Sequence, residues 1–463
     1  MILLTNTLYL IASIFFVLGI KGLTRPKTAI KGNYFAAIGM LIAIVVTLFN
    51  QNILSFGAII AGIIIGSFIG GLMAKKVKMT SMPQMVALLN GFGGGASLSI
   101  AVASYIIPAS VAEEVALFSQ VAVILTTLIG AITLTGSAIA FAKLQELISG
   151  NSIGFTGIKY FNLALTITAL IIGYQLIAGP QNMTLMFLLI GITCLLGITL
   201  VLPIGGADMP VVISLLNSYS GIAAAAAGFI MGNTVLMVSG ALVGASGIIL
   251  TQIMCVAMNR SIANVIFGSM AETSGEKVDP DDVYAGKVKS SSPEEVAMIL
   301  ETARRVVFIP GFGMAMAQAQ HAVRELASSL ISKGIEVEYG IHPVAGRMPG
   351  HMNVLLAEAE VDYDLMKTMD EINPTFDQTD VAIVIGANDV TNPMAKEDKS
   401  CPIYGMPILD VGKAKTVIVV KRSLSAGFAG LPNPLFANDN TLMLFGDGKK
   451  VIQALNTAFN ETF

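Results

Sequence analysis

The most specific chemical signal in the sequence is a glycine turn between an apolar run and a helical pattern. Residues 306–309 suit a buried parallel strand, Gly311 and Gly313 follow at once, and Met314 opens a stretch with apolar residues at helical spacing. A strand, a glycine turn and a helix form a dinucleotide cradle, because the first glycine makes the tight turn, the second lets the backbone approach a pyrophosphate, and the helix N-terminus presents amides. Met316 stands where this fingerprint has glycine or alanine, so an ordinary strand–helix turn stays an alternative.

A second signal lies directly after the apolar run 416–420, where Lys421, Arg422 and Ser423 stand together. Two cations and a hydroxyl suit a dianionic phosphate. The 2′-phosphate of a nucleotide is such a group, so the trio favours NADP over NAD. Two alternatives remain: a solvated charged turn, or a ribose hydroxyl bound by Glu338, about 25 residues past the glycines, as in NAD sites.

The elements that must position these residues are short apolar runs alternating with helical stretches. Strands are predicted at 306–309, 335–341, 381–385, 416–420 and 442–445, which indicates a doubly wound parallel sheet of the Rossmann-like α/β class. Ligands bind past the carboxyl ends of such strands. The loop of residues 340–350 therefore brings Arg347 to that edge, and the loop of residues 386–393 brings Gly386, Asn388 and Asp389.

Composition divides the 463 residues into two halves. Residues 1–260 carry ten Lys or Arg and four Asp or Glu, which leaves 17 basic (27 − 10) and 26 acidic (30 − 4) residues for the remainder. A weakly basic apolar half is thus followed by an acidic half, and this balance excludes a basic surface for nucleic acid. Cys194, Cys255 and Cys401 lack metal or redox spacing, so they are interpreted as packing residues.

The apolar half contains nine segments close to the ~20 residues that a membrane helix needs. They are residues 3–20, 34–49, 53–73, 83–107, 115–141, 160–178, 185–202, 209–231 and 234–258. The basic residues all fall in alternate loops: Lys21, Arg25, Lys27, Lys31, Lys75, Lys76, Lys78, Lys143, Lys159 and Arg260. The positive-inside rule then predicts an N-terminus outside and a cytoplasmic C-terminal domain, and the first apolar run is a span rather than a signal peptide. We expect a transmembrane domain at 1–260, a linker at 261–292, and a nucleotide domain at 293–463 whose first helix begins at Ser292 and Pro293.

Small residues recur every fourth position at Gly62, Gly66 and Gly70 and again at Gly240 and Gly244, which predicts close helix packing. The glycine-rich residues 91–95 lie inside an apolar span and are interpreted in the same way.

Few polar groups enter the spans, and each is expensive there. The ones singled out are Asn90, Ser137 and the run Asn217-Ser218-Tyr219-Ser220 within spans, and Asp208 at the mouth of one. Each alone fits an interhelical hydrogen bond; together they could line a polar path.

Several long motifs resemble one known family. Gly311-Phe312-Gly313-Met314-Ala315, residues 340–353, Gly386 to Asp389 and Lys421 to Ser423 resemble the NADP(H)-binding domain of proton-translocating NAD(P) transhydrogenase. Residues 205–210 and 217–221 resemble the membrane domain of that family. The resemblance covers essentially the whole chain and matches the beta subunit of the bacterial, split-chain form.

The resemblance implies reversible hydride transfer from NADH to NADP⁺, coupled to inward proton flow across the bacterial cytoplasmic membrane. By resemblance, Gly311 and Gly313 approach the pyrophosphate, Lys421 to Ser423 hold the 2′-phosphate, and Arg347 and Asp389 belong to switching loops near the nicotinamide. His342 and Asn353 share the Arg347 loop. Asn90, Ser137, Asp208 and Asn217 match positions linked to proton conduction or gating.

Partners follow from the same resemblance. Direct hydride transfer between two nicotinamides requires positioning and dryness, with no acid, base, nucleophile or metal from this chain. One cradle on this chain places NAD(H) on a separate alpha subunit that carries further membrane helices, and the complex is expected to be a dimer. Some members have histidine where this chain has Asn90, so a titrating imidazole would come from the partner; Phe312 and Phe428 replace tyrosines of some relatives.

Two other classes stay open. One is a nine-span transporter or channel regulated by a nucleotide-binding cytoplasmic domain, although the sequence has neither a K⁺-filter motif nor obvious repeats. The other is a membrane-anchored NADP reductase.

Overall fold

The computed structural model describes residues 2–24, 26–49, 56–107, 113–150, 152–259, 261–267, 284, 286–348, 350–399, 401, 403–427 and 429–462. Arg25, Arg260, Phe428 and residues 268–283 of the predicted linker lie outside this part. The described chain forms two compact units. The first contains residues 1–205 and 212–251, and the second contains residues 206–211 and 252–463.

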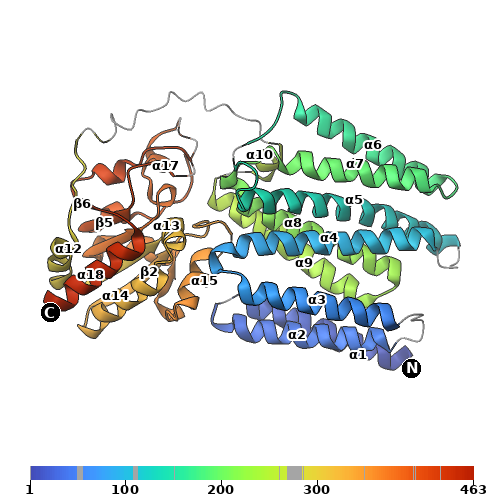
Figure 1. The fold of residues 1–463 in the computed structure, drawn as a ribbon, viewed down its shortest axis with the longest axis horizontal. Helices are drawn as coiled ribbons and strands as arrows, with labels where there is room; N and C mark the ends of the chain where they lie inside the picture. Colours follow the sequence, from blue (N-terminus) through green and yellow to red (C-terminus); the bar gives the residue numbers. More distant parts are fainter. Residues whose placement is uncertain are drawn as a thin grey trace. The chain divides into compact units, whose positions relative to one another are not determined.

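Among the described residues, nine helices are long and apolar enough to cross a membrane, as the sequence predicts. They are α1 (Ile2–Leu23), α2 (Pro26–Leu48), α3 (Phe56–Lys76), α4 (Met82–Ile106), α5 (Glu113–Leu144), α6 (Ile158–Ala178), α7 (Met183–Val201), α8 (Met209–Met231) and α9 (Thr234–Ala257). Figure 1 shows them as a bundle of roughly parallel rods.

Glycines bring two helix pairs into backbone contact. On the seam between α4 and α5, a Cβ placed on Gly94 would lie 2.8 Å from the carbonyl oxygen of Gly130. On the seam between α8 and α9, a Cβ on Gly221 would lie 2.9 Å from the carbonyl oxygen of Gly240. The predicted packing roles of residues 91–95 and of Gly240 are confirmed, because only glycine permits these approaches.

The same prediction is wrong for α3 within this chain. A Cβ on Gly62, Gly66 or Gly70 would meet nothing within 4 Å among the described residues, and α3 has no buried residue there. Small residues at every fourth position permit a close helix contact, but they do not show which polypeptide supplies the partner helix.

The second unit contains a six-stranded, all-parallel sheet in the order β3-β2-β1-β4-β5-β6. The strands are β1 (Arg305–Pro310), β2 (Glu336–Ile341), β3 (Met366–Thr368), β4 (Val381–Ile385), β5 (Thr416–Lys421) and β6 (Thr441–Phe445). The chain runs outward from β1 in one direction as far as β3 and then returns to β4 on the other side. A doubly wound sheet binds its ligand at this reversal, past the carboxyl ends of β1 and β4.

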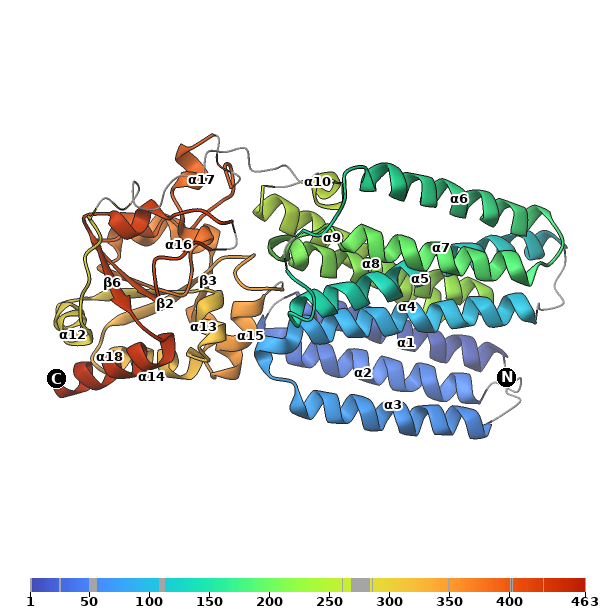
Figure 2. The same ribbon diagram turned by 45° about the horizontal axis from the view of Figure 1, so that its top comes forward.

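Helices cover both faces of the sheet (Figure 2). The longer helices of the second unit are α12 (Pro293–Glu301), α14 (Gln320–Ser332), α15 (His351–Glu358) and α18 (Gly448–Thr462), and its short helices, not all of which lie on the sheet, are α10 (Ile262–Phe267), α13 (Phe312–Met316), α16 (Met369–Ile372) and α17 (Met394–Glu397). The predicted start of α12 is confirmed, because the Ser292 side chain and Glu295 form a reciprocal capping box.

The sheet core explains why the strands could be recognised. All five residues of β4 are buried, and Val307 and Ile309 of β1 share one apolar cluster with Val384, Phe376 and several residues of β5. A central strand with helices on both faces buries every side chain, so it appears in sequence as an uninterrupted apolar run.

Two local features differ from the sequence prediction. The short edge strand β3 was not predicted, because it has only three residues, two of them polar, and none of the three is buried. The helix expected to continue from Met314 is instead broken: α13 ends at Met316, Gln318 adopts φ +51°, and α14 begins at Gln320. A left-handed residue cannot continue an α-helix, so the cradle helix is a single short turn followed by a separate longer helix.

Candidate functional site

Two glycine turns meet where the strand order reverses. The amide of Gly311 donates to the carbonyl of Ile385 at 2.9 Å, and the amide of Gly313 donates to the carbonyl of Gly386 at 2.8 Å. A Cβ on Gly311 would lie 2.5 Å from the backbone of Ala387, and one on Gly313 would lie 2.6 Å from Cα of Gly386, which itself has φ +62°. The close approach of two loops therefore requires glycine here, independently of any nucleotide.

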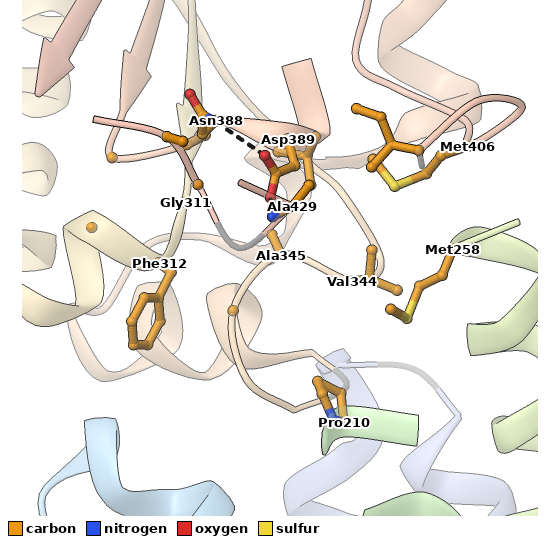
Figure 3. Close-up of a pocket in the computed structure, with 18 of the residues that line it drawn as sticks. Pro210, Met258, Gly311, Phe312, Val344, Ala345, Asn388, Asp389, Met406 and Ala429 are labelled. Atoms are coloured by element: carbon orange, nitrogen blue, oxygen red, sulfur yellow. Dashed lines mark hydrogen bonds between the residues drawn. The ribbon is translucent and has the colours of Figure 1, made fainter. Parts of the chain in front are cut away.

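The next two residues of the cradle motif lie in the protein core. Met314 and Ala315 are fully buried in α13. Their side chains fix this helical turn against the domain, so any contribution to a ligand comes from their backbone. Phe312 differs, because its ring is only half-buried and lies beside the glycine turn (Figure 3).

The loop after β2 reaches the cradle through Phe312. The Arg347 guanidinium carbon lies 4.4 Å from the centroid of the Phe312 ring, within cation–π range. The amide of Arg347 donates to Nδ1 of the fully buried His351 at 3.1 Å. Burial and, to a smaller extent, the Arg347 charge together lower the pKa of His351 to about 4, so the imidazole is neutral at physiological pH.

His342, at the start of the same loop, is also a neutral structural residue. Its Nδ1 accepts a hydrogen bond from the amide of Val344 at 3.3 Å, so its Nε2 carries the proton and donates to the carbonyl of Pro407 at 2.8 Å. Burial lowers the pKa of this imidazole below its usual value. His342 thus joins the loop after β2 to the segment before β5.

The loop after β4 presents Asn388 and Asp389 to the pocket shown in Figure 3. The Asp389 carboxylate accepts one hydrogen bond from Nδ2 of Asn388 and another from the amide of Ala429, each at 3.0 Å. A Cβ on Gly427 would lie 2.6 Å from Oδ1 of Asp389. Asp389 therefore links the loop after β4 to the loop after β5.

The basic trio lies at the end of β5, as predicted. Lys421, Arg422 and Ser423 line a small cavity of about 240 Å³ together with Gly313 and Gly386. This cavity joins two predicted features, the glycine turns and the cationic strand end.

The three side chains of the trio differ in their surroundings. The Lys421 ammonium donates to Oδ1 of Asn388 at 3.3 Å and to the carbonyl of Ser425, and burial lowers its pKa. Arg422 is mostly exposed and lies 3.3 Å from the Asp447 carboxylate. The half-buried Lys421 is therefore the stronger electrostatic feature of the trio.

The geometry disfavours the alternative that Glu338 binds a ribose. Glu338 lies in the middle of β2 rather than at its carboxyl end, and its carboxylate contacts the Arg305 guanidinium. Lys367 lies 3.8 Å from the same carboxylate. These contacts hold the Glu338 carboxylate away from the edge of the sheet at which the glycine turns lie.

One residue of the site escaped the sequence interpretation. Tyr284, in the predicted linker, is buried in the core of the second unit and stacks on Phe436 with ring centroids 6.5 Å apart. Its hydroxyl accepts a hydrogen bond from the amide of Asn433 at 3.2 Å, and Asn433 in turn donates to the carbonyl of Asn388 at 3.0 Å. A single aromatic residue in a charged, aperiodic stretch is the only sequence signal for this contact.

Three of the four polar membrane residues lie on adjoining helix faces in the first unit. Nδ2 of Asn90 on α4 donates to the carbonyl of Ile213 on α8 at 3.2 Å, and a Cβ on the neighbouring Gly91 would lie 3.1 Å from Cβ of Ser137 on α5. Asn217 stands one helical turn beyond Ile213, on the same side of α8. Asp208 is not part of this group, because it lies in the short 3₁₀ turn that precedes α8.

Together these features define a class: a multi-pass membrane protein joined to a dinucleotide-fold domain with a cationic pocket at its β1/β4 reversal. A sequence model of the NAD(P) transhydrogenase beta subunit family matches residues 5–458. Two sequences named NAD(P) transhydrogenase subunit beta from Rhodospirillum rubrum, one of them from a designated strain, are each 48% identical to this chain over 461 residues, covering 99% of both partners. The chain belongs to the NAD(P) transhydrogenase beta subunit family.

Proposed function

We infer that this chain is the NADP(H)-binding and proton-conducting subunit of a proton-coupled transhydrogenase. The reaction is reversible hydride transfer from NADH to NADP⁺, linked to proton translocation across the membrane. The observation that carries this proposal is the cavity shared by Lys421, Arg422 and Ser423 with Gly313 and Gly386, in a chain that also has nine candidate membrane spans.

The residues present fit a phosphorylated dinucleotide. Gly313 and Gly386 line the same cavity as the trio, and neither carries a side chain that would keep a pyrophosphate from the backbone there. The half-buried Lys421 ammonium has two neutral oxygens as acceptors, and a phosphate dianion beside it would offset the burial that lowers its pKa. We assign the 2′-phosphate to Lys421, Arg422 and Ser423, and the pyrophosphate to the backbone of residues 311–315 and of Gly386.

A nicotinamide held in this site supplies the hydride chemistry, and the protein supplies placement and dryness. The loops that carry Arg347 and Asp389 lie at the rim of the site. Arg347 is held against the Phe312 ring, and Asp389 is held by Asn388 and the amide of Ala429. We propose that these two loops close the site against water and change their arrangement during the catalytic cycle.

NAD(H) is assigned to a separate alpha subunit. Each polypeptide then holds one nucleotide, and hydride transfer requires the two domains to meet. We further propose that the complex is a dimer in the bacterial cytoplasmic membrane, with the N-terminus of this chain outside and its α/β domain in the cytoplasm. The clustering of Lys75, Lys76 and Lys78 at the end of α3 and just beyond it supports this orientation.

Proton movement drives the reaction only if it changes the affinity for NADP(H). A potential of 100 mV supplies about 2.3 kcal/mol per proton. By linkage, protonation along the path of Asn90, Ser137, Asn217 and Asp208 must shift the nucleotide equilibrium by a comparable amount.

The decisive experiment measures hydride exchange between NADH and an NADP⁺ analogue by the assembled complex in sealed vesicles, with and without an uncoupler. A coupled transhydrogenase gives exchange whose rate rises when the uncoupler removes back-pressure. A nucleotide-regulated transporter gives no exchange, and a membrane-anchored reductase gives exchange that ignores the uncoupler. Variants at Arg347 and Asp389 that retained both NADPH affinity and coupling would contradict the switching role of their loops.

A further inference from the structure

Among the described residues, the buried serine and threonine hydroxyls of the membrane helices all have a hydrogen-bond partner, with two exceptions. A serine or threonine in an apolar helix normally donates to the carbonyl four residues earlier, as Thr127 does to Val123 at 2.8 Å and Thr133 does to Ile129 at 2.6 Å. Thr126 and Ser137 on α5 are also fully buried, yet their hydroxyl oxygens have no hydrogen-bond partner among the described residues. Leaving such a group unsatisfied costs about 1–3 kcal/mol, and a buried water is the usual remedy.

The two hydroxyls lie on one stripe of α5. Residues seven and eleven positions apart on an α-helix fall on nearly the same face, so Thr126, Thr133 and Ser137 point in similar directions. That face packs against α4, because a Cβ on Gly94 would lie 2.8 Å from Cβ of Thr133 and one on Gly91 would lie 3.1 Å from Cβ of Ser137.

The position of Thr126 fills a gap in the predicted proton path. Asn90 and Ser137 lie close to one level of the bundle, Asn217 lies one helical turn beyond the Ile213 contact of Asn90, and Ser137 is only seven residues from the end of α5 at Leu144. Ser137 is thus about 10 Å from that end of the helix, and the candidate span Leu117–Leu144 continues for 20 residues (137 − 117) on its other side. Thr126 lies about 16 Å from Ser137 along the helix axis, within this remaining part.

We propose that the Thr126 hydroxyl holds a water molecule in the half of the proton path remote from Asn90 and Ser137. The inference rests on the proposed proton-conducting function and adds a residue to its path. The hydroxyl hydrogen-bonds to this water and keeps its own proton, while the proton in transit passes from water to water. Thr126 is thus a positioning residue for the water chain and does not store the proton.

The test compares two neighbouring threonines in the full complex reconstituted in sealed vesicles. Thr126→Val removes the hydroxyl at nearly constant shape. Thr127→Val is the matched control, because Thr127 is equally buried but its hydroxyl bonds within its own helix. Thr126→Ser keeps the hydroxyl. The readouts are proton uptake during hydride exchange and the NADPH dissociation constant of the same preparation.

We expect Thr126→Val to slow coupled proton uptake about tenfold with an unchanged NADPH dissociation constant, and Thr127→Val and Thr126→Ser to stay within about threefold of the parent. Equal rates for Thr126→Val and Thr127→Val would overturn the proposal. A parent complex that exchanges hydride without moving protons would instead refute the proposed function itself, so the two failures are distinguishable.

A second pair of variants tests hydration directly and covers the case in which Thr126→Val does not assemble. Thr126→Cys and Thr127→Cys are prepared in a background where Cys194, Cys255 and Cys401 are replaced by alanine. A small, water-borne thiol reagent reacts with a cysteine only where water reaches it. We expect Thr126→Cys to react at least about tenfold faster than Thr127→Cys, and equal rates would overturn the proposal.

Discussion

The sharpest prediction concerns the charge of Lys421, the last residue of β5. Replacing it with glutamine removes the cation but keeps a side-chain N–H that can still donate to Asn388 or to the carbonyl of Ser425. NADPH carries the 2′-phosphate and NADH does not. The substitution should therefore weaken NADPH binding and leave NADH binding nearly unchanged.

The magnitude follows from the surroundings of the ammonium. Lys421 is half-buried, with Nζ 5.0 Å from the centroid of the Phe436 ring, so solvent screens its charge less than at the surface. A charge-assisted hydrogen bond to a phosphate in such a place contributes about 1.5–3 kcal/mol. This corresponds to an increase of roughly 10- to 150-fold in the NADPH dissociation constant. Arg422 is mostly exposed and adjoins Asp447, so Arg422→Gln should have a smaller effect, of about two- to tenfold.

The same strand provides the control. Lys415 directly precedes β5 and lies at its opposite end, where it is exposed and bonded to Asp380 at 2.7 Å. Lys415→Gln removes the same charge from the same strand, far from the glycine turns. Both variants are titrated with NADPH by nucleotide fluorescence on the purified complex, and a parallel NADH titration reports the alpha-subunit site and so serves as the check that the complex is intact. Equal NADPH affinities in Lys421→Gln and Lys415→Gln would refute the assignment of the 2′-phosphate.

Three further predictions concern the stability of the α/β domain. Gly313→Ala places a Cβ 2.6 Å from backbone that cannot move aside, so calorimetry should show its unfolding temperature lowered by about 2–12 °C, whereas Gly412→Ala, with contacts of 3.5 Å, should stay close to the parent. Tyr284→Phe removes the hydrogen bond from the amide of Asn433 and should destabilise the domain by about 0.5–1.5 kcal/mol in denaturant titrations. The pKa of His351 is about 4 in the folded state, below its unfolded value. Its contribution to the free energy of unfolding is therefore complete above pH 6.5 and is lost as the pH falls toward 4. The difference between the unfolding temperatures at pH 7 and at pH 5 should therefore be smaller in His351→Asn than in the parent.

Much of the α/β domain was predictable because burial on both faces leaves a simple sequence pattern. The runs at 306–309, 381–385 and 416–420 lie in β1, β4 and β5. Once the sheet is parallel, the segments after these strands must gather at one edge. The glycine turns and the trio from Lys421 to Ser423 could thus be placed in one site without knowledge of any contact between them.

The remaining features depend on contacts that leave no periodic signal. The break at Gln318 arises from one backbone angle, and β3 is too short to show alternation. Arg347 and Phe312 are in contact although they lie 35 residues apart in the sequence (347 − 312), and neither residue type by itself predicts that contact. The glycine repeat of α3 shows a further limit of prediction from sequence. The repeat identifies a surface suited to helix packing, but it does not show whether the partner helix belongs to this chain or to another.

The packing of Tyr284 suggests how a signal from the membrane half could enter the nucleotide site. This buried ring belongs to the predicted linker, and its hydroxyl is bonded to Asn433. Asn433 is bonded in turn to the carbonyl of Asn388, whose side chain contacts both Asp389 and Lys421. Three consecutive hydrogen-bonded steps therefore join the entry of the domain to the cation assigned to the 2′-phosphate. Linkage requires a coupling energy comparable to the ~2.3 kcal/mol that one proton gains across 100 mV, and breaking or forming two such bonds is a change of that size. If this chain of contacts transmits the coupling, Tyr284→Phe will reduce the effect of the uncoupler on hydride exchange by more than its small loss of stability explains.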